Sequence, residues 1–292
     1  MNLFALTDDP SCRIKRFKIS ADLQNDINQQ FMNQEERFRT TTKDLIPFDG
    51  KYKPDQGETL FIKEFDDIDG LEDAINNPLN IHEINPDIED FERIKAIFSG
   101  YRADKEEKTI ILIQNFEKRR IISTSGISIF HDKDEYIKII GNGLTLDSKL
   151  TAILENKELK FNSFHLIKQI FDMASYYQEA TDSDIDSFAS LENIHVNKKT
   201  VLIENSDSWV RRKLWLISQS QILQKIPVTQ IKAIAAEFSI ELKTEKFNDE
   251  EKICIPEDKR ELKKLLRFLD EDYYKSPLLN NGYISNSKRL IP

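Results

Sequence analysis

The pattern of hydrophobic and polar positions is clearest near the C-terminal end of the chain, between Asp258 and Asp270. Leucines recur there at positions i, i+3, i+4 and i+7, namely Leu262, Leu265, Leu266 and Leu269. Cations have the same spacing on the adjacent face, namely Arg260, Lys263, Lys264 and Arg267. The spacing predicts a helix over 258–270 with one apolar face and, beside it, a basic ridge formed by these four cations, about two helical turns long.

Further helices are predicted on both sides of the middle of the chain. Two of them cover roughly 205–224 and 228–238, and Pro227 marks the start of the second, where a missing amide does least harm. A polar helical stretch also runs from about 21 to 38, and Ser20 before it can serve as its N-cap.

Short apolar runs separated by turn residues predict β-strands in the first half of the chain. The runs cover 3–7, 14–19, 59–65, 109–114, 120–124, 126–130 and 136–140. Those after 108 indicate an antiparallel meander, and 150–161 a further hairpin. Because strands come early and helices late, the predicted fold class is α+β, with mixed and antiparallel N-terminal sheets and helices followed by a mostly helical C-terminal region.

Composition is that of an ordinary soluble globular protein, with 292 residues of which 39% are hydrophobic and 32% charged. Cys12 and Cys254 are the only cysteines, which gives no disulfide framework and indicates a reducing, cytoplasmic location. No apolar run approaches the roughly 20 residues that cross a bilayer. We therefore expect a partner to bring the protein to a membrane if it works at one.

The charge is distributed unevenly along the chain. The net charge of −9 argues at first against a nucleic-acid partner, but residues 1–197 hold 24 Lys and Arg against 37 Asp and Glu, whereas 198–292 hold 18 against 14. Residues 64–92, called here the acidic segment, contain eleven Asp or Glu and no Lys or Arg. The acidic segment is either a solvated surface or a docking face for a basic partner.

A second group of cations lies beside aromatic residues. Arg211, Arg212 and Lys213 follow Trp209, and helical spacing lets Arg211 and Arg212 flank the indole of Trp215. Aromatic rings with guanidinium groups are a combination suited to nucleic acids. Two tryptophans in one helix are also typical of a core, so core packing stays an alternative for the tryptophans.

The C-terminal stretch 273–289 is rich in hydroxyls and amides and ends on Lys288 and Arg289. Such groups bind phosphate oxygens. An ordinary tail held down by Tyr273 and Tyr283 would have the same composition, and both interpretations stay open.

The sequence indicates no catalytic residue, no metal site and no cofactor. Glu241 and Lys243 have the Glu-x-Lys spacing of restriction-type nucleases, in which a carboxylate holds a metal ion, but so short a pattern arises easily by chance. The four histidines are scattered, and no phosphate-binding Gly-Lys-Ser loop or Gly-x-Ser-x-Gly turn is present.

Several motifs of the C-terminal third carry a family resemblance. They are Trp209-Val-Arg-Arg-Lys-Leu, the run Ile253-Cys-Ile-Pro, the helix Asp258-Lys-Arg-Glu-Leu-Lys-Lys-Leu-Leu-Arg-Phe-Leu-Asp-Glu-Asp-Tyr-Tyr and the closing Asn286-Ser-Lys-Arg. With these motifs the chain resembles the Kiwa protein B family of bacteria and archaea. The resemblance is most specific over about 200–292 and extends from about 105. It implies a division into an N-terminal α+β region, 1–105, and a Kiwa protein B-like domain, 106–292.

The resemblance implies a role in anti-phage defence. In the two-component Kiwa system, this cytoplasmic protein acts beside a small transmembrane partner and binds DNA as the effector. It is also expected to form a homo-oligomer and to be recruited to the inner face of the membrane by its partner.

We therefore hypothesise that the protein is a non-catalytic defence effector that binds the DNA backbone largely without sequence specificity. The predicted DNA-binding residues are Arg211, Arg212, Lys213, Arg260, Lys263, Lys264, Arg267, Lys288 and Arg289. Two alternatives stay open. One is a metal-dependent nuclease that uses Glu241 and Lys243, and the other is an adaptor that docks another protein through the acidic segment without touching DNA.

Overall fold

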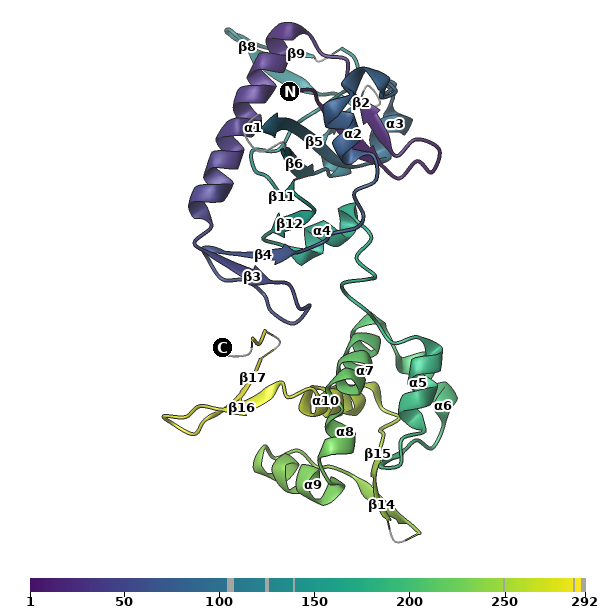
Figure 1. The fold of residues 1–292 in the computed structure, drawn as a ribbon. Helices are drawn as coiled ribbons and strands as arrows, with labels where there is room; N and C mark the ends of the chain where they lie inside the picture. Colours follow the sequence, from purple (N-terminus) through teal and green to yellow (C-terminus); the bar gives the residue numbers. More distant parts are fainter. Residues whose placement is uncertain (104–107, 124–125, 139, 249, 286, 290–292) are drawn as a thin grey trace. The chain divides into compact units, whose positions relative to one another are not determined.

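The fold is described from a computed structural model that covers residues 1–103, 108–123, 126–138, 140–248, 250–285 and 287–289 (Figure 1). The chain forms two compact units. The first unit comprises 1–48 and 53–173, and the second comprises 49–52 and 174–292.

The first unit is built on an eight-stranded sheet with the order β2-β1-β5-β6-β11-β12-β4-β3. Neighbouring strands are antiparallel except for the parallel pair β3 and β4. Its strands are β1 (Phe4–Thr7), β2 (Ile14–Arg16), β3 (Asp44–Pro47), β4 (Glu58–Ile62), β5 (Ile94–Ala103), β6 (Lys108–Asn115), β11 (Ala152–Glu155) and β12 (Glu158–Phe161). The predicted hairpin over 150–161 is confirmed as β11 and β12.

Helices pack on both faces of this sheet. Along β5, alternate side chains point to opposite faces. Ile97 packs in one core cluster with Phe31 of helix α1 (Ala21–Thr41). On the other face, a Cβ placed on Gly100 would lie 2.9 Å from Ile75 of helix α2 (Leu71–Asn76), so α1 and α2 cover opposite faces. The remaining helical segments of the unit are η1 (Pro78–Asn80), α3 (Ile88–Glu92), η2 (Lys118–Arg120) and α4 (Phe164–Ile170).

Helix α1 is fixed at its start by a cap and at its end by ion pairs. The hydroxyl of Ser20 accepts a hydrogen bond from the amide of Leu23, which confirms the predicted N-cap. In the last turns, Arg39 bonds to Glu35 at 2.8 Å and to Glu155 of β11 at 2.9 Å. Because Glu155 is buried, these bonds tie the helix to the middle of the sheet.

The prediction of one antiparallel meander after residue 108 is wrong, because these strands belong to three different sheets. Strand β6 pairs with β5 and β11, while β7 (Ile121–Ile122) pairs with β10 (Gly143–Leu144), and β8 (Ile129–Asp132) with β9 (Glu135–Lys138). The apolar run of β6 is buried because it lies in the middle of the large sheet, between long-range partners. The local pattern of apolar runs carries no information on such partners.

The second unit packs helices around a small sheet with the order β13-β15-β14, and ends in the hairpin β16-β17. One core cluster joins Val210, Leu214 and Leu266 with Ile253 of the sheet. The helices and strands are α5 (Asp182–Ala189), β13 (Ile194–His195), α6 (Lys199–Asn205), α7 (Ser208–Ser220), α8 (Ile222–Lys225), α9 (Val228–Glu237), β14 (Thr244–Phe247), β15 (Glu250–Cys254), α10 (Lys259–Leu269), β16 (Tyr273–Lys275) and β17 (Gly282–Ile284).

The predicted helices at 228–238 and 258–270 are confirmed as α9 and α10, but the single helix over 205–224 is wrong. Asp207 begins α7 by accepting a hydrogen bond from the amide of Val210. Gln221 then adopts a left-handed backbone with φ of 56°, which ends α7 and starts α8. A cap and a turn residue, rather than the apolar spacing, set these ends.

The two units together have an α+β composition, as predicted. Apart from residues 49–52, which belong to the second unit, the chain passes from the first unit to the second between Met173 and Ala174. The sequence-based division at 105/106 falls outside the described residues, between β5 and β6. Because these two strands pair along their whole length in one sheet, both belong to the first unit.

Candidate nucleic-acid interface

The basic ridge lies on the exposed side of α10. Asp258 caps this helix by accepting hydrogen bonds from the amides of Arg260 and Glu261, and the leucine face is buried in the core. The side chain of Arg260 is exposed, and those of Lys263, Lys264 and Arg267 are partly exposed. The amphipathic spacing therefore places all four cations at the surface of the second unit.

Trp209 gathers cations from two helices. The ammonium group of Lys263 lies 5.3 Å from its ring centre, and the guanidinium of Arg267 lies 5.6 Å from it. Lys213 of α7 lies at 5.6 Å. These distances are those of cation–π contacts, which hold the long side chains of the ridge against α7.

Asp207 offsets part of the charge of the ridge. Its carboxylate lies 2.7 Å from the Nζ of Lys263 and 3.2 Å from that of Lys259. Desolvation acts to raise the pKa of Asp207, but the hydrogen bonds from Lys263, the amide of Val210 and Lys259 outweigh it and lower the pKa to about 2. Arg260, Lys264 and Arg267 have no ion pair among the described residues. Because Arg267 packs against Trp209, Arg260 and Lys264 are the ridge cations most available to an external anion.

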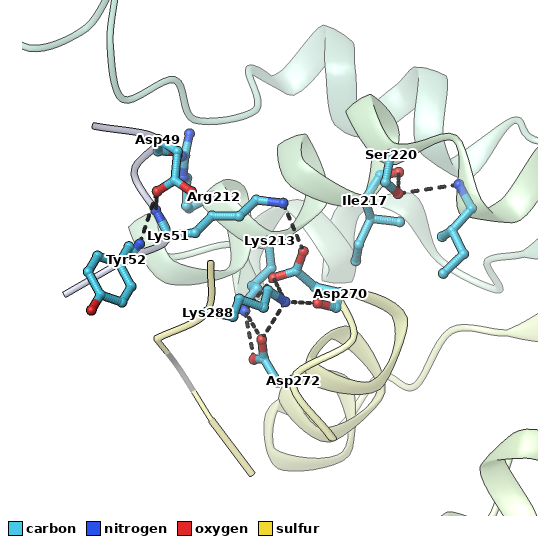
Figure 2. A network of polar contacts seen from close by, with 11 residues as sticks. Asp49, Lys51, Tyr52, Arg212, Lys213, Ile217, Ser220, Asp270, Asp272 and Lys288 are labelled. Atoms are coloured by element: carbon cyan, nitrogen blue, oxygen red, sulfur yellow. Dashed lines mark hydrogen bonds and ion pairs between the residues drawn. The ribbon is translucent and has the colours of Figure 1, made fainter. Parts of the chain in front are cut away.

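Lys213 and Lys288 are bound inside the second unit. Figure 2 shows both side chains directed at Asp270 and Asp272, which follow α10. The Nζ of Lys213 lies 2.6 Å from each carboxylate, and that of Lys288 lies 2.9 Å from Asp272 and bonds to the carbonyl of Asp270. Because both aspartates are almost fully buried, they require these cations as partners.

Arg212 is also buried. Its guanidinium donates hydrogen bonds to the carbonyls of Gln178 and Asp49, and stacks 4.2 Å from the ring of Tyr177 and 5.0 Å from that of Trp215. The predicted contact of Arg212 with the indole of Trp215 is confirmed. Burial lowers the pKa of Arg212 because it removes water from the charged group.

Arg211 and Arg289 lie apart from the ridge. Instead of flanking Trp215, Arg211 donates to the carbonyls of Ala180 and Ser206 and pairs with Asp182 at 2.6 Å. Arg289 is exposed, and its guanidinium lies 5.1 Å from the ring of Tyr52. Of the nine predicted residues, four form the ridge. Lys213 and Lys288 form with Asp270 and Asp272 what is called here the buried ionic cluster, and Arg212 is buried beside it. Arg211 and Arg289 belong to neither group.

Residues 100–279 match the family described as Kiwa protein KwaB-like. The chain belongs to this family. The family implies a role in Kiwa anti-phage defence. Comparison with curated proteins and with solved structures gives no match.

The match of the KwaB-like family spans parts of both units, including all of α7 and α10. Seven of the predicted DNA-binding residues lie on α7 and α10. All of them except Arg211 belong to the ridge or lie in or beside the buried ionic cluster. No helix among the described residues of this KwaB-like chain is long and apolar enough to span a membrane.

The Glu-x-Lys pair of the nuclease alternative borders a cleft of about 820 Å³. Glu241 and Lys243 line it together with Glu245 and with Lys264 of α10. Over the ranges that the structure describes, however, no three His, Cys, Asp or Glu side chains come close enough together to hold a metal ion.

The acidic segment binds cations of its own unit. Its Asp67 pairs with Arg13 at 2.5 Å, and Asp90 pairs with Lys15 of β2 at 2.8 Å. Glu83 pairs in the same way with Arg16. Part of its negative charge is therefore offset within the first unit, and these carboxylates have a structural contact that the charge pattern alone did not indicate.

Sequence reasoning missed Lys51, Asp207 and Lys259. Lys259 could have been found, because it stands four residues before Lys263 and both reach the same carboxylate. Lys51 could not, since it lies in a turn far from α10 in the sequence and comes within 4.0 Å of Asp270 only through the fold of the second unit.

Proposed function

We propose that this KwaB-like protein is a defence effector that binds DNA through the phosphate backbone, largely without sequence specificity. The observation that carries the proposal is the row of four cations at the surface of α10, three of which have no ion pair among the described residues. A row of cations can follow phosphates, and contacts to phosphates position a protein without reading bases.

The length of the basic ridge sets the expected strength of its salt dependence. Arg260 and Arg267 are seven residues apart, which is roughly 10.5 Å along a helix. Phosphates of one DNA strand follow at about 3.4 Å along the axis, so the ridge can face about three of them. Three neutralised phosphates give a slope of about −2.7 in log affinity against log salt, or a loss of about 40-fold between 50 and 200 mM salt.

The test is fluorescence anisotropy with a labelled random duplex across that salt range. Arg260→Gln together with Lys264→Gln should reduce the slope by about 1.8, because each substitution removes one phosphate contact. Lys118→Gln together with Arg119→Gln is the matched control, since these exposed side chains of the first unit carry the same charge. Equal slopes for the two double variants would overturn the role of the ridge.

The same reactions separate the effector from a nuclease. With Mg²⁺ present, the effector should leave plasmid DNA intact. Cleavage that Glu241→Ala abolishes would instead favour the nuclease. The absence of binding even at 50 mM salt would favour the adaptor that docks through the acidic segment.

We further propose that the protein acts beside a membrane-embedded partner protein and assembles with copies of itself. Membership of the KwaB-like family supports this proposal, because the Kiwa system to which the family points has two components. Light scattering of the purified chain tests self-assembly, and co-purification with the partner from membranes tests recruitment. A monomeric mass would refute the first part, and a partner recovered without this chain would refute the second.

A further inference from the structure

A small cavity of about 100 Å³ adjoins the buried ionic cluster of the second unit. Its charged lining consists of Lys51, Arg212, Lys213, Lys288, Asp270 and Asp272. Four cations thus face two carboxylates, an excess of two positive charges. Asp49, whose carboxylate accepts hydrogen bonds from two backbone amides of its own turn, does not line the cavity.

Arg212 is the least compensated of these cations. It is only 5% exposed, and its Nε is buried and has no hydrogen-bond partner among the described residues. Its other contacts are two carbonyls and the faces of two aromatic rings, rather than a carboxylate. A buried guanidinium without an anionic partner is costly, so an anion beside it would be stabilising.

The backbone at Gly50 packs closely against the guanidinium of Arg212. A Cβ on Gly50 would lie 2.2 Å from the guanidinium, and the residue has a left-handed φ of 72°. Lys51, which follows, and Lys288 have side chains that are 32% and 28% exposed. The cavity is therefore bordered by a closely fitted guanidinium inside and by two lysines that reach solvent.

The volume restricts the ligand. It is well below the roughly 300 Å³ of pockets that enclose a whole drug-sized molecule. A single tetrahedral anion fits this space, whereas a nucleoside does not. A phosphate dianion also matches the excess of two positive charges, and guanidinium and ammonium groups are its usual partners.

From this geometry we infer that the cavity is a binding site for one phosphate group, supplied either by inorganic phosphate or by a terminal phosphate monoester such as the 5′ end of a DNA strand. Lys51 and Arg212 bind the anion, and Lys213 and Lys288 remain with their aspartates. The site is separate from the basic ridge, so it does not depend on the proposed function.

The two tryptophans of the chain make the site directly measurable. Trp209 lines the cavity and Trp215 stacks on Arg212, so their intrinsic fluorescence reports on an anion bound there. Sodium phosphate should produce a saturable change that sodium chloride of equal ionic strength does not. Lys51→Met should weaken phosphate binding by about 10-fold to 100-fold, the usual effect of one charged hydrogen bond.

Lys118→Gln is the control, because it removes an exposed cation of the first unit that lies outside the cavity, and it should leave phosphate binding unchanged. Arg212→Met should abolish the fluorescence change. If the Arg212→Met variant does not fold, the exposed Lys51→Met variant still tests the site. A linear response to phosphate, an equal response to chloride, or unchanged affinity in Lys51→Met would each overturn the site.

Oligonucleotides with a 5′-phosphate or a 5′-hydroxyl distinguish the two sources of the phosphate. A preference for the phosphorylated end that Lys51→Met removes assigns the site to DNA ends, and binding of inorganic phosphate alone assigns it to the free ion. If the ridge variants lose duplex affinity while phosphate still binds, the two proposals are confirmed separately. If the protein does not bind duplex DNA at all, the phosphate titration still shows whether the cavity is a phosphate-binding site.

Discussion

Substitution of Lys213 separates structural cations from cations that bind DNA. Its ammonium group makes three hydrogen bonds of 2.6 to 2.8 Å with Asp270 and Asp272, whose side chains are 4% and 0% exposed. Lys213→Met keeps most of the side-chain volume but leaves two buried carboxylates with Lys288 as their main partner. We therefore expect Lys213→Met to destabilise the protein without changing its salt-dependent affinity for DNA.

The magnitude follows from the burial of the pair. Removing one partner of a buried ion pair costs about 3–5 kcal/mol, and the remaining contacts of Lys288 place the expected loss near about 3 kcal/mol. That is a large part of the roughly 5–15 kcal/mol that stabilises a typical domain. The melting temperature of the second unit should fall on the order of 10 °C.

The assay combines denaturation with DNA binding. Urea unfolding followed by circular dichroism gives the free energy of unfolding, and anisotropy with duplex DNA gives the salt slope of the folded protein. Asp272→Asn in the Lys213→Met background should recover part of the lost stability, because it removes one unpaired carboxylate. Arg260→Gln is the matched control, with stability within about 0.5 kcal/mol of the parent and a slope reduced by about 0.9.

The opposite pattern would refute the reasoning. If Lys213→Met were as stable as the parent chain but bound DNA with a shallower salt slope, Lys213 would be a DNA contact and not a counterion of the two aspartates.

Two further predictions concern the first unit. Burial acts to raise the pKa of Glu155, but hydrogen bonds from Arg39 and Lys160 outweigh it and lower the pKa from 4.5 to about 2. The ionised carboxylate therefore adds about 3 kcal/mol to the free energy of unfolding above pH 4.5, and this contribution is lost as the pH falls toward 2. Urea unfolding between pH 7 and 2.5 should show a smaller acid loss for Glu155→Gln than for the parent, and equal losses would contradict the ion pairs. In Gly100→Ala, the new Cβ would lie 2.3 Å from the carbonyl oxygen of Ile110, so thermal unfolding should show a loss of about 1–3 kcal/mol, and an unchanged melting temperature would contradict the close strand packing.

Local features of the chain were predictable from the sequence. The spacing of leucines and cations gave α10, and Ser20 gave the start of α1, because helix periodicity and capping depend on residues no more than about four positions apart. The hairpin of β11 and β12 was predictable for the same reason, since its strands are joined by a short turn. Family membership was also within reach, because its motifs are contiguous in the sequence.

Strand partners and the state of each cation were decided only by the tertiary structure. Nothing near β6 in the sequence indicates that β11 is its neighbour. Lys213 and Arg260 read alike in the sequence, yet one is buried against Asp272, 59 positions away, while the other is exposed. The cavity at Arg212 needs the turn of Asp49, 163 positions away. Burial and pairing of charge depend on such distant residues, which local periodicity does not encode.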